Sequence, residues 1–142
     1  MEASEIIQPA GWKKPRGYAN GILAPAGARA LFVAGQIAWD AEQRLVGGPD
    51  FVAQFRQALS NVVQVVARAG GQSSDLTRVT IYVVDAQAYT AGAKEVGAAW
   101  REIVGPWYPA MTLIVVAGLL ERGALVEIEA TAMIPPDADR PA

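Results

Sequence analysis

The sequence predicts a single α+β domain, and three features of the residue pattern support this fold class. Segments with strand or helix periodicity follow one another as strand, strand, helix, strand, helix, strand, strand. The range 50–69 carries apolar residues at the spacing of one helix face, and the range 124–133 alternates apolar and polar residues as a strand does. Two amphipathic helices can cover only one face of a sheet, so we expect both on the same side.

Length and composition fit one domain, residues 1–142, with an irregular leader over 1–17 and a loose tail over 135–142. Hydrophobic residues make up 52% of the chain and charged residues 18%, so either the core is unusually rich or part of the surface is buried in an oligomer. With a net charge of −2, the chain does not have the excess of positive charge that is typical of nucleic-acid-binding proteins, so we expect no nucleic-acid partner.

The chain contains neither cysteine nor histidine. This excludes disulfides, thiolate nucleophiles, histidine-based triads and metal sites with thiolate or imidazole ligands. Proton transfer must therefore depend on Glu, Asp, Tyr or Lys, and the glycines form no phosphate-binding loop. No apolar run has the length of a signal peptide or a membrane span, so we expect a cytoplasmic protein with no membrane partner.

The first half of the chain predicts two strands and a helix. Strands over 19–24 and 29–34 are expected to form a hairpin around a Pro-Ala-Gly turn. The helix over 50–69 begins at Asp50, whose charge suits a helix N-terminus, and stops at two glycines. Its polar side chains, Gln54 among them, are expected to lie away from an apolar stripe made of Phe51, Phe55, Ala58, Leu59, Val62, Val66 and Ala69.

The second half predicts a strand over 77–84, a helix over 86–104 capped by Asp85, and strands over 110–117 and 124–133. Two of these strands, in the ranges 79–84 and 110–117, are apolar on both faces, although the helices cover only one. We therefore expect the other face of the sheet to meet another copy of the chain or a partner.

Two carboxylates on the last strand are the first candidates for chemistry. Glu127 and Glu129 point to the same side of this strand, which is the side that the helices leave bare. Two interpretations are open. Either both are ordinary surface groups that face solvent or pair with Arg or Lys, or a neighbouring subunit buries one of them and raises its pKa, which would make it a proton donor.

Residues around the first strands are candidates for ligand binding. Gly35 follows a strand and either leaves backbone amides free to hold a ligand oxygen or simply forms a turn. Tyr18 either orients a ligand or packs, and Trp39 belongs either to a pocket or to the core. Arg16 and two nearby lysines form either a solvated basic segment or an anion site.

Together these residues resemble the RidA/YjgF family of imine and enamine deaminases, from about Tyr18 to Met133. The resemblance implies a chorismate-mutase-like fold, with a six-stranded mixed sheet, two helices packed on one face, and a homotrimer that encloses three clefts between subunits. The segments that carry it are Gly17-Tyr18, Val33-Ala34-Gly35-Gln36-Ile37, the ranges 54–70 and 79–85, Pro109-Ala110, and the range 124–130.

The resemblance also assigns roles in the cleft. Glu127 would be the catalytic residue, because the family's glutamate at this position positions or protonates the hydrolytic water. The residues expected to bind the substrate, by the resemblance or by their place in the sequence, are Tyr18, Ala34, Gly35, Gln36, Trp39, Gly97, Met111 and Leu113.

Four of these positions depart from the family pattern. Met111 stands where deaminating members have the Arg that holds the substrate carboxylate, and Ala34, Gly97 and Leu113 stand where Ser, Asn and Cys are frequent. A thioether cannot replace a guanidinium, so small 2-imino acids should bind poorly. The more apolar cleft would suit a larger or aromatic ligand, and whether Arg16 supplies the missing cation is open.

The leading hypothesis is a hydrolytic deaminase that acts on an imine or enamine, with Glu127 as general acid–base, ammonia as the leaving group and no cofactor. The alternative is a trimer that binds a small apolar ligand without catalysis. A third interpretation, a ribonuclease, is disfavoured by the acidic composition and the lack of histidine.

Overall fold

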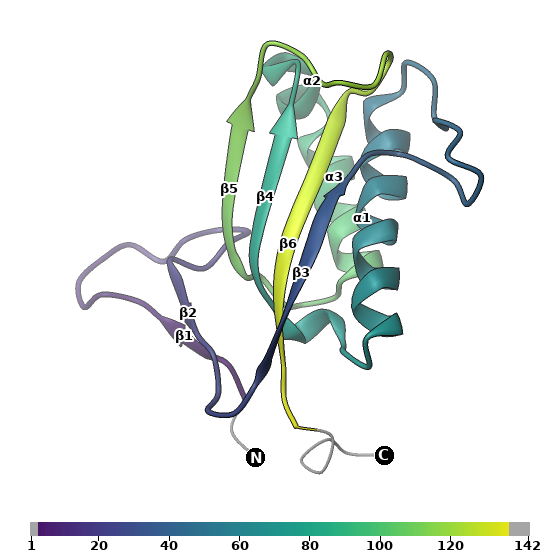
Figure 1. Ribbon diagram of the computed structural model, residues 1–142. Helices are drawn as coiled ribbons and strands as arrows, with labels where there is room; N and C mark the ends of the chain where they lie inside the picture. The colour runs from purple at the N-terminus through teal and green to yellow at the C-terminus, as the bar shows by residue number, and fades with distance from the viewer. Residues whose placement is uncertain (1–2, 137–142) are drawn as a thin grey trace.

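The computed structural model describes residues 3–136 and has the predicted α+β class, with helices packed on one face of a mixed sheet (Figure 1). The main sheet is four-stranded, in the order β3-β6-β4-β5. β4 and β5 run parallel, and the other two pairings are antiparallel. The strands are β3 (Arg29–Gln36), β6 (Val126–Ile134), β4 (Leu76–Val83) and β5 (Ala110–Val115).

The prediction of one six-stranded sheet is wrong, because the other two strands pair with each other. β1 (Glu5–Ile7) and β2 (Gly21–Leu23) form a separate two-stranded sheet that stands apart from the main one in Figure 1. The expected hairpin between 19–24 and 29–34 is therefore absent: β2 pairs with β1, and β3 pairs with β6. Five residues separate β2 from β3, and each of these two strands forms its backbone hydrogen bonds with a different partner.

The leader is held to the main sheet at one point. The Ala19 backbone N–H donates to the Pro109 carbonyl (2.9 Å), and Ala19 forms an isolated parallel bridge with Ala110. This attachment brings the residues just before Ala19 to the β5 edge of the sheet. At the other end of the chain, Pro135 is buried, and the rest of the expected tail, 137–142, lies outside the described residues.

Helix α1 (Phe51–Arg68) confirms the predicted helix, and the Asp50 side chain caps it by accepting a hydrogen bond from the Ala53 backbone N–H (3.1 Å). The second predicted helix is divided in two, α2 (Ala86–Ala91) and α3 (Ala93–Ile103). Gly92 lies at the break, where a residue without a side chain stabilises the helix least. As expected, Asp85 caps α2, accepting from the N–H groups of Gln87 (2.9 Å) and Ala88 (3.3 Å).

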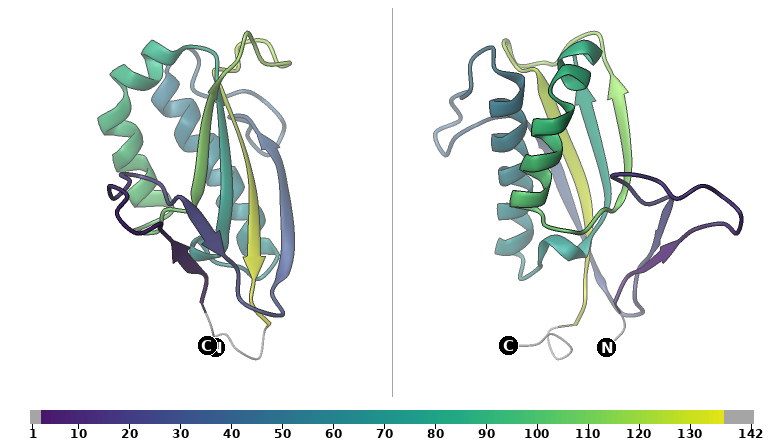
Figure 2. Two further views of the ribbon diagram at one scale, coloured as in Figure 1. Left: turned by 90° about the vertical axis from the view of Figure 1, so that its left-hand side faces the viewer. Right: turned by 180° about the vertical axis from the view of Figure 1, so that it is seen from behind.

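The core lies between the sheet and the helices α1 and α3, which cover the same face of the sheet (Figure 2). A short 3₁₀ helix (Ser73–Asp75) leads from α1 into β4. The side chains of this core include Phe55, Leu59, Val62, Val66, Leu76, Val79, Val83, Trp100, Val126 and Ile128.

Gln54 does not lie on the exposed side of α1 as the sequence predicts; it is fully buried. Its Nε2 donates to the carbonyls of Gly48 (2.8 Å) and Gly123 (2.9 Å), and its Oε1 accepts from the Leu125 backbone N–H (2.9 Å). These three hydrogen bonds satisfy the buried amide and tie α1 to the loop that enters β6.

The face of the sheet away from the helices is less apolar than the strand sequences predict. It carries Thr80 and Tyr82 from β4 and Glu127 and Glu129 from β6, since their neighbours along each strand point into the core. The largest exposed apolar side chain on this open face is Phe32 of β3, which is 79% exposed.

Candidate functional site

A bulge at the end of β3 shapes the surroundings of Glu127. The β3–β6 register shifts between Val33 and Gln36, so that Ala34 and Gly35 lie in the bulge. The Gln36 side-chain amide donates to the Ala34 carbonyl (2.9 Å) and closes this turn of the backbone. Bulges of this kind redirect the chain and are frequent next to binding sites.

Gly35 and Glu127 pack directly against each other. A Cβ at position 35 would lie 2.9 Å from Cδ of Glu127, closer than real Cβ atoms come, and 3.1 Å from Cγ, which is a tight contact. The half-buried Glu127 side chain would have to move to admit any other residue at position 35. The glycine therefore permits the observed position of Glu127.

Glu127 and Gly35 both line a cavity of about 310 Å³, which we call the Glu127 cavity. Gln36, Trp39 and Leu120 also line it, and the exposed Leu120 comes from the loop between β5 and β6. Within residues 3–136, the indole nitrogen of Trp39 is the one buried side-chain polar atom without a hydrogen-bond partner.

Glu129 has a different environment from Glu127. Its Oε1 accepts a hydrogen bond from the Tyr82 hydroxyl (2.6 Å), and the residue is exposed. This hydrogen bond is the main reason why the pKa of Tyr82 lies above its ordinary value, with desolvation and the two carboxylate charges adding to the effect. Glu129 thus pairs with a phenol rather than with the Arg or Lys considered from the sequence.

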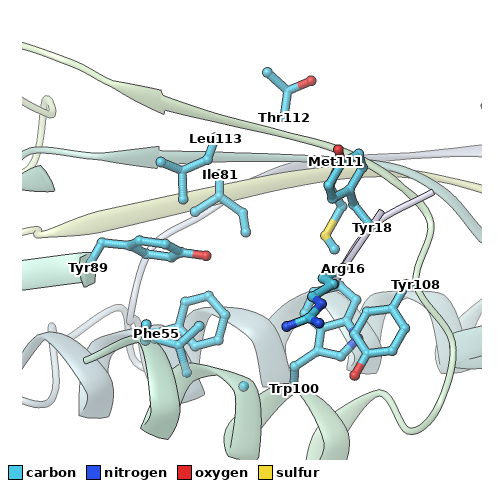
Figure 3. A pocket seen from close by; sticks show the side chains of 14 residues that line it. Arg16, Tyr18, Phe55, Ile81, Tyr89, Trp100, Tyr108, Met111, Thr112 and Leu113 are labelled. Atoms are coloured by element: carbon cyan, nitrogen blue, oxygen red, sulfur yellow. The ribbon is translucent and has the colours of Figure 1, made fainter. Parts of the chain in front are cut away.

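A second cavity, of about 440 Å³, lies between β5 and α3 on the helix side of the sheet, and we call it the β5 cavity (Figure 3). Figure 3 shows Met111 and Leu113 on one side, Trp100 and Tyr108 on another, and Tyr89 with its hydroxyl directed inward. Burial raises the pKa of the Tyr89 hydroxyl, which keeps it protonated. The described residues that line the β5 cavity are Arg16, Gly17, Tyr18, Phe55, Ile81, Tyr89, Ala93, Val96, Gly97, Trp100, Tyr108, Met111, Thr112 and Leu113.

The aromatic wall of the β5 cavity is fixed by hydrogen bonds and stacking. Trp100 donates from Nε1 to the Trp107 carbonyl (2.9 Å), and Trp107 donates from Nε1 to the Leu76 carbonyl (2.8 Å). The Tyr108 ring stacks on Trp100, with centroids 6.1 Å apart and an interplanar angle of 13°. These contacts hold the ring positions, so the wall is preformed.

The structure divides the predicted site residues between the two cavities. Gly35, Gln36, Trp39 and Glu127 line the Glu127 cavity, whereas Tyr18, Gly97, Met111 and Leu113 line the β5 cavity. Ala34 is exposed and is not among the described residues that line either one.

The two groups lie on opposite faces of the sheet. Leu113 pairs with Ile81, which points into the helix-side core, whereas Glu127 pairs with Tyr82 on the open face. In addition, β4 separates β6 from β5. One protomer therefore does not bring Glu127 to Met111 and Leu113.

Sequence reasoning missed part of both linings. Tyr89 and Trp100 belong to the segment predicted as a helix over 86–104, whose pattern does not show that they form a cavity wall, and Tyr108 lies in the connection before β5, where no pattern indicates direction. Leu120 and Gln43 reach the Glu127 cavity from loops, where no periodicity indicates direction.

Comparison with known proteins identifies the fold family. Residues 16–134 match the family described as endoribonuclease L-PSP. The chain is also similar to YyfB of Yersinia pestis, described as a protein of unknown function of the conserved Rid family; the identity is 34%, covering 94% of this chain and 100% of that chain, with a TM-score of 0.81. The chain belongs to the Rid family.

Other solved Rid proteins show how widely the names in this family vary. A member of the YjgF/YER057c/UK114 family from Mycobacterium tuberculosis is 29% identical, covers 84% of this chain and 88% of its own, and has a TM-score of 0.59. A probable translation initiation inhibitor from Rhodopseudomonas palustris is 25% identical over 94% of this chain and 100% of its own, with a TM-score of 0.65. Membership of the Rid family therefore establishes the fold and leaves the reaction open.

Within residues 3–136, no group of three or more acidic side chains is placed to hold a metal ion. In the same part of the chain, no helix is both long and apolar enough to cross a membrane.

Proposed function

We propose that this Rid protein is a hydrolytic deaminase of an imine or enamine, with active sites formed between the protomers of a homotrimer. The observation that carries this proposal is the packing of Glu127 against Gly35 in a cavity on the open face of the sheet. A half-buried carboxylate at the wall of a cavity is suited to general acid–base catalysis.

The division of the site supports the assembly. The β5 cavity has an aromatic and aliphatic lining suited to a ligand but no carboxylate among its described lining residues, whereas the Glu127 cavity has two, Glu127 and Glu121. Strand β4 lies between β6 and β5, so these two strands are roughly 10 Å apart. Glu127 on β6 and the cavity-lining side chains of Met111 and Leu113 on β5 also point to opposite faces of the sheet. A cyclic arrangement of copies brings the Glu127 cavity of one protomer to the β5 cavity of the next.

The proposed reaction consumes water and releases ammonia without oxidation. Glu127 takes a proton from water as the oxygen attacks the carbon of the C=N bond, and passes this proton to the nitrogen, which gives a carbinolamine. Glu127 then takes the proton of the new hydroxyl group and passes it to the amine as the C–N bond breaks, so that a carbonyl compound and ammonia leave. The Gly35 backbone and the Tyr18 phenol would hold the substrate while these bonds change.

Met111 limits the range of substrates. It lies on β5 where its side chain lines the β5 cavity, and its thioether offers no charge to a carboxylate at that position. We expect weak or no activity on small 2-imino acids, and a preference for substrates with an apolar or aromatic body.

A coupled assay tests the proposal. An amino-acid oxidase generates imines from small or aromatic amino acids, and the ammonia released is measured with and without this protein. Glu127→Gln should abolish the acceleration, because the amide cannot accept the proton. The matched control is Glu129→Gln, a change on the same face of the same strand, and it should retain most of the activity. Equal rates for wild-type protein and Glu127→Gln would contradict the proposal.

The second candidate function is ligand binding without catalysis, and Met111 is the observation that favours it, since β5 offers no guanidinium to the cavity. Glu127→Ala separates the two functions. In a binding protein this variant should change the affinity for an apolar ligand by no more than a few-fold, and neither it nor the wild type should release ammonia. In an enzyme the variant should keep its affinity for the ligand but lose the ammonia release that the wild type shows.

A further inference from the structure

The β5 cavity has one charged group among its described lining residues, and that group is Arg16. Ala19 anchors this part of the leader at the start of β5, through its N–H to the Pro109 carbonyl, and so brings Arg16 to the cavity. Figure 3 shows Arg16 beside Met111 and Trp100. Within residues 3–136, the ion pairs of the arginines involve Arg44 and Arg56, and Arg16 has no carboxylate partner.

A guanidinium without a carboxylate partner, at a cavity whose other described lining side chains are apolar or uncharged, favours a ligand with an apolar body and a single negative charge. The planar fork of Arg matches a carboxylate with two parallel hydrogen bonds. A dianionic phosphate is usually bound by several cations or backbone amides, but Lys13 and Lys14 are not among the lining residues. The chemistry of the cavity is therefore that of a carboxylate site.

The space for the apolar body lies between Gly97 and the aromatic wall. A Cβ at Gly97 would meet only Arg101 Nη1, at 3.4 Å, so the helix leaves a gap at this position. Phe55, Ile81 and Val96 form an apolar floor, and all three are buried. A cavity of about 440 Å³ has room for an aromatic ring with a short acid side chain.

We propose that the β5 cavity binds aromatic or bulky apolar carboxylic acids, with Arg16 holding the carboxylate and the gap at Gly97 receiving the apolar body. Arg16 thereby supplies the cation that Met111 does not, from the leader instead of from β5. That such an acid is also the substrate rests on the proposed deaminase function; the binding itself does not.

Calorimetric titration with unreactive probes tests this inference. The probes are 3-phenylpropionate, its neutral amide 3-phenylpropanamide, and acetate, each titrated into the full-length protein. Wild-type protein should bind 3-phenylpropionate about tenfold or more tighter than the amide, because a hydrogen bond to a charged partner is the stronger one. Acetate should bind at least about tenfold more weakly than 3-phenylpropionate, since it lacks the apolar body.

Variants assign the two parts of the cavity. Arg16→Gln should weaken binding of 3-phenylpropionate about tenfold and leave the amide within about twofold, while Arg16→Lys should retain part of the acid preference. Gly97→Leu fills the gap and should weaken both aromatic probes. Arg122→Gln, on an exposed loop outside the described lining of both cavities, is the matched control and should behave as wild type. Circular dichroism establishes that each variant is folded.

Equal affinity of wild-type protein for the acid and the amide, or unchanged acid binding by Arg16→Gln, would overturn the inference. Absence of binding by every probe would overturn it as well. The deaminase proposal fails separately: acid binding that depends on Arg16, with no ammonia released from any imine, supports the inference and contradicts the proposed reaction. Ammonia release together with acid binding that Arg16→Gln leaves unchanged supports the reaction and overturns the inference.

Discussion

The side chain of Glu127 packs directly against the backbone of Gly35 at the end of β3. A Cβ on residue 35 would lie 2.9 Å from the carboxyl carbon of Glu127. The bulge at Ala34 and Gly35 creates this contact by shifting the end of β3 relative to β6. The position of the proposed catalytic carboxylate therefore depends on a neighbouring residue that has no side chain.

Gly35→Ala should displace the Glu127 carboxylate and lower activity more than it lowers stability. The added methyl group meets the flexible end of the Glu127 side chain, which can move aside, so the unfolding free energy should fall by less than about 1 kcal/mol. Activity should fall by at least about tenfold, because general acid–base catalysis depends on position. Gly118→Ala is the control, since a Cβ there meets nothing within 4 Å. Ammonia release and urea unfolding, measured on both variants, check the prediction, and a fully active Gly35→Ala would contradict it.

Replacing the buried amide of Gln54 should destabilise the fold. Gln54→Leu keeps the volume but leaves the Gly48 and Gly123 carbonyls and the Leu125 N–H without their partner. We expect a loss of about 3 kcal/mol, from three hydrogen bonds of about 1 kcal/mol each. Gln64→Leu, on the exposed side of the same helix, should stay within about 0.5 kcal/mol of wild type. Urea unfolding at equal protomer concentration compares the two, and equal losses would refute the structural role of Gln54.

Alanine at position 97 should stabilise helix α3. Gly97 lies in the helix interior, and the new Cβ would meet only the mobile end of Arg101. We expect a gain of about 1 kcal/mol from the higher helix propensity of alanine. Gly105→Ala should have the opposite sign, because Gly105 has a φ of +100° that alanine adopts with strain. Denaturant midpoints with unchanged slopes test both, and a destabilised Gly97→Ala would show that this position is more crowded than described.

The Tyr82–Glu129 hydrogen bond predicts a pH dependence at high pH. This bond holds the pKa of Tyr82 in the folded protein above that of the unfolded chain, which is about 10. Its contribution to stability is therefore fully present below about pH 10 and is lost as the pH rises through the folded-state pKa. Glu129→Gln should lower the pKa of Tyr82, and Glu95→Gln should leave it unchanged. Ultraviolet titration of tyrosinate, with Tyr82→Phe to identify the signal, measures the shift; identical curves for wild type and Glu129→Gln would contradict it.

The sequence predicts those parts of the fold that follow from periodicity. The stripe on α1, the helix start at Asp50, the cap at Asp85 and the shared face of Glu127 and Glu129 are all confirmed. The pairing of β1 with β2 is set by contacts between distant residues, which local pattern does not encode. Gln54 shows the same limit, because its burial depends on partners about 70 residues away.

The candidate site could be predicted as a set of residues but not as an arrangement. Glu127 and Met111 were assigned to one cleft by resemblance, and the strand order and side-chain alternation place them on opposite faces of one protomer. Arg16 had no pattern to distinguish a solvated cation from a cavity residue. Its place follows from the attachment of Ala19 to β5, which only the folded chain reveals.

Hybrid trimers provide the most direct measurement of whether two protomers build each site. Glu127→Gln and Gly97→Leu protomers, each inactive alone in the proposed scheme, are co-expressed with different tags and the mixed assemblies are isolated. In a cyclic trimer every mixed assembly, whichever variant is in the majority, joins one intact Glu127 cavity to one intact β5 cavity. The mixed trimers should therefore recover about one third of the wild-type ammonia release. Mixed assemblies that form and remain inactive would contradict an active site shared between protomers.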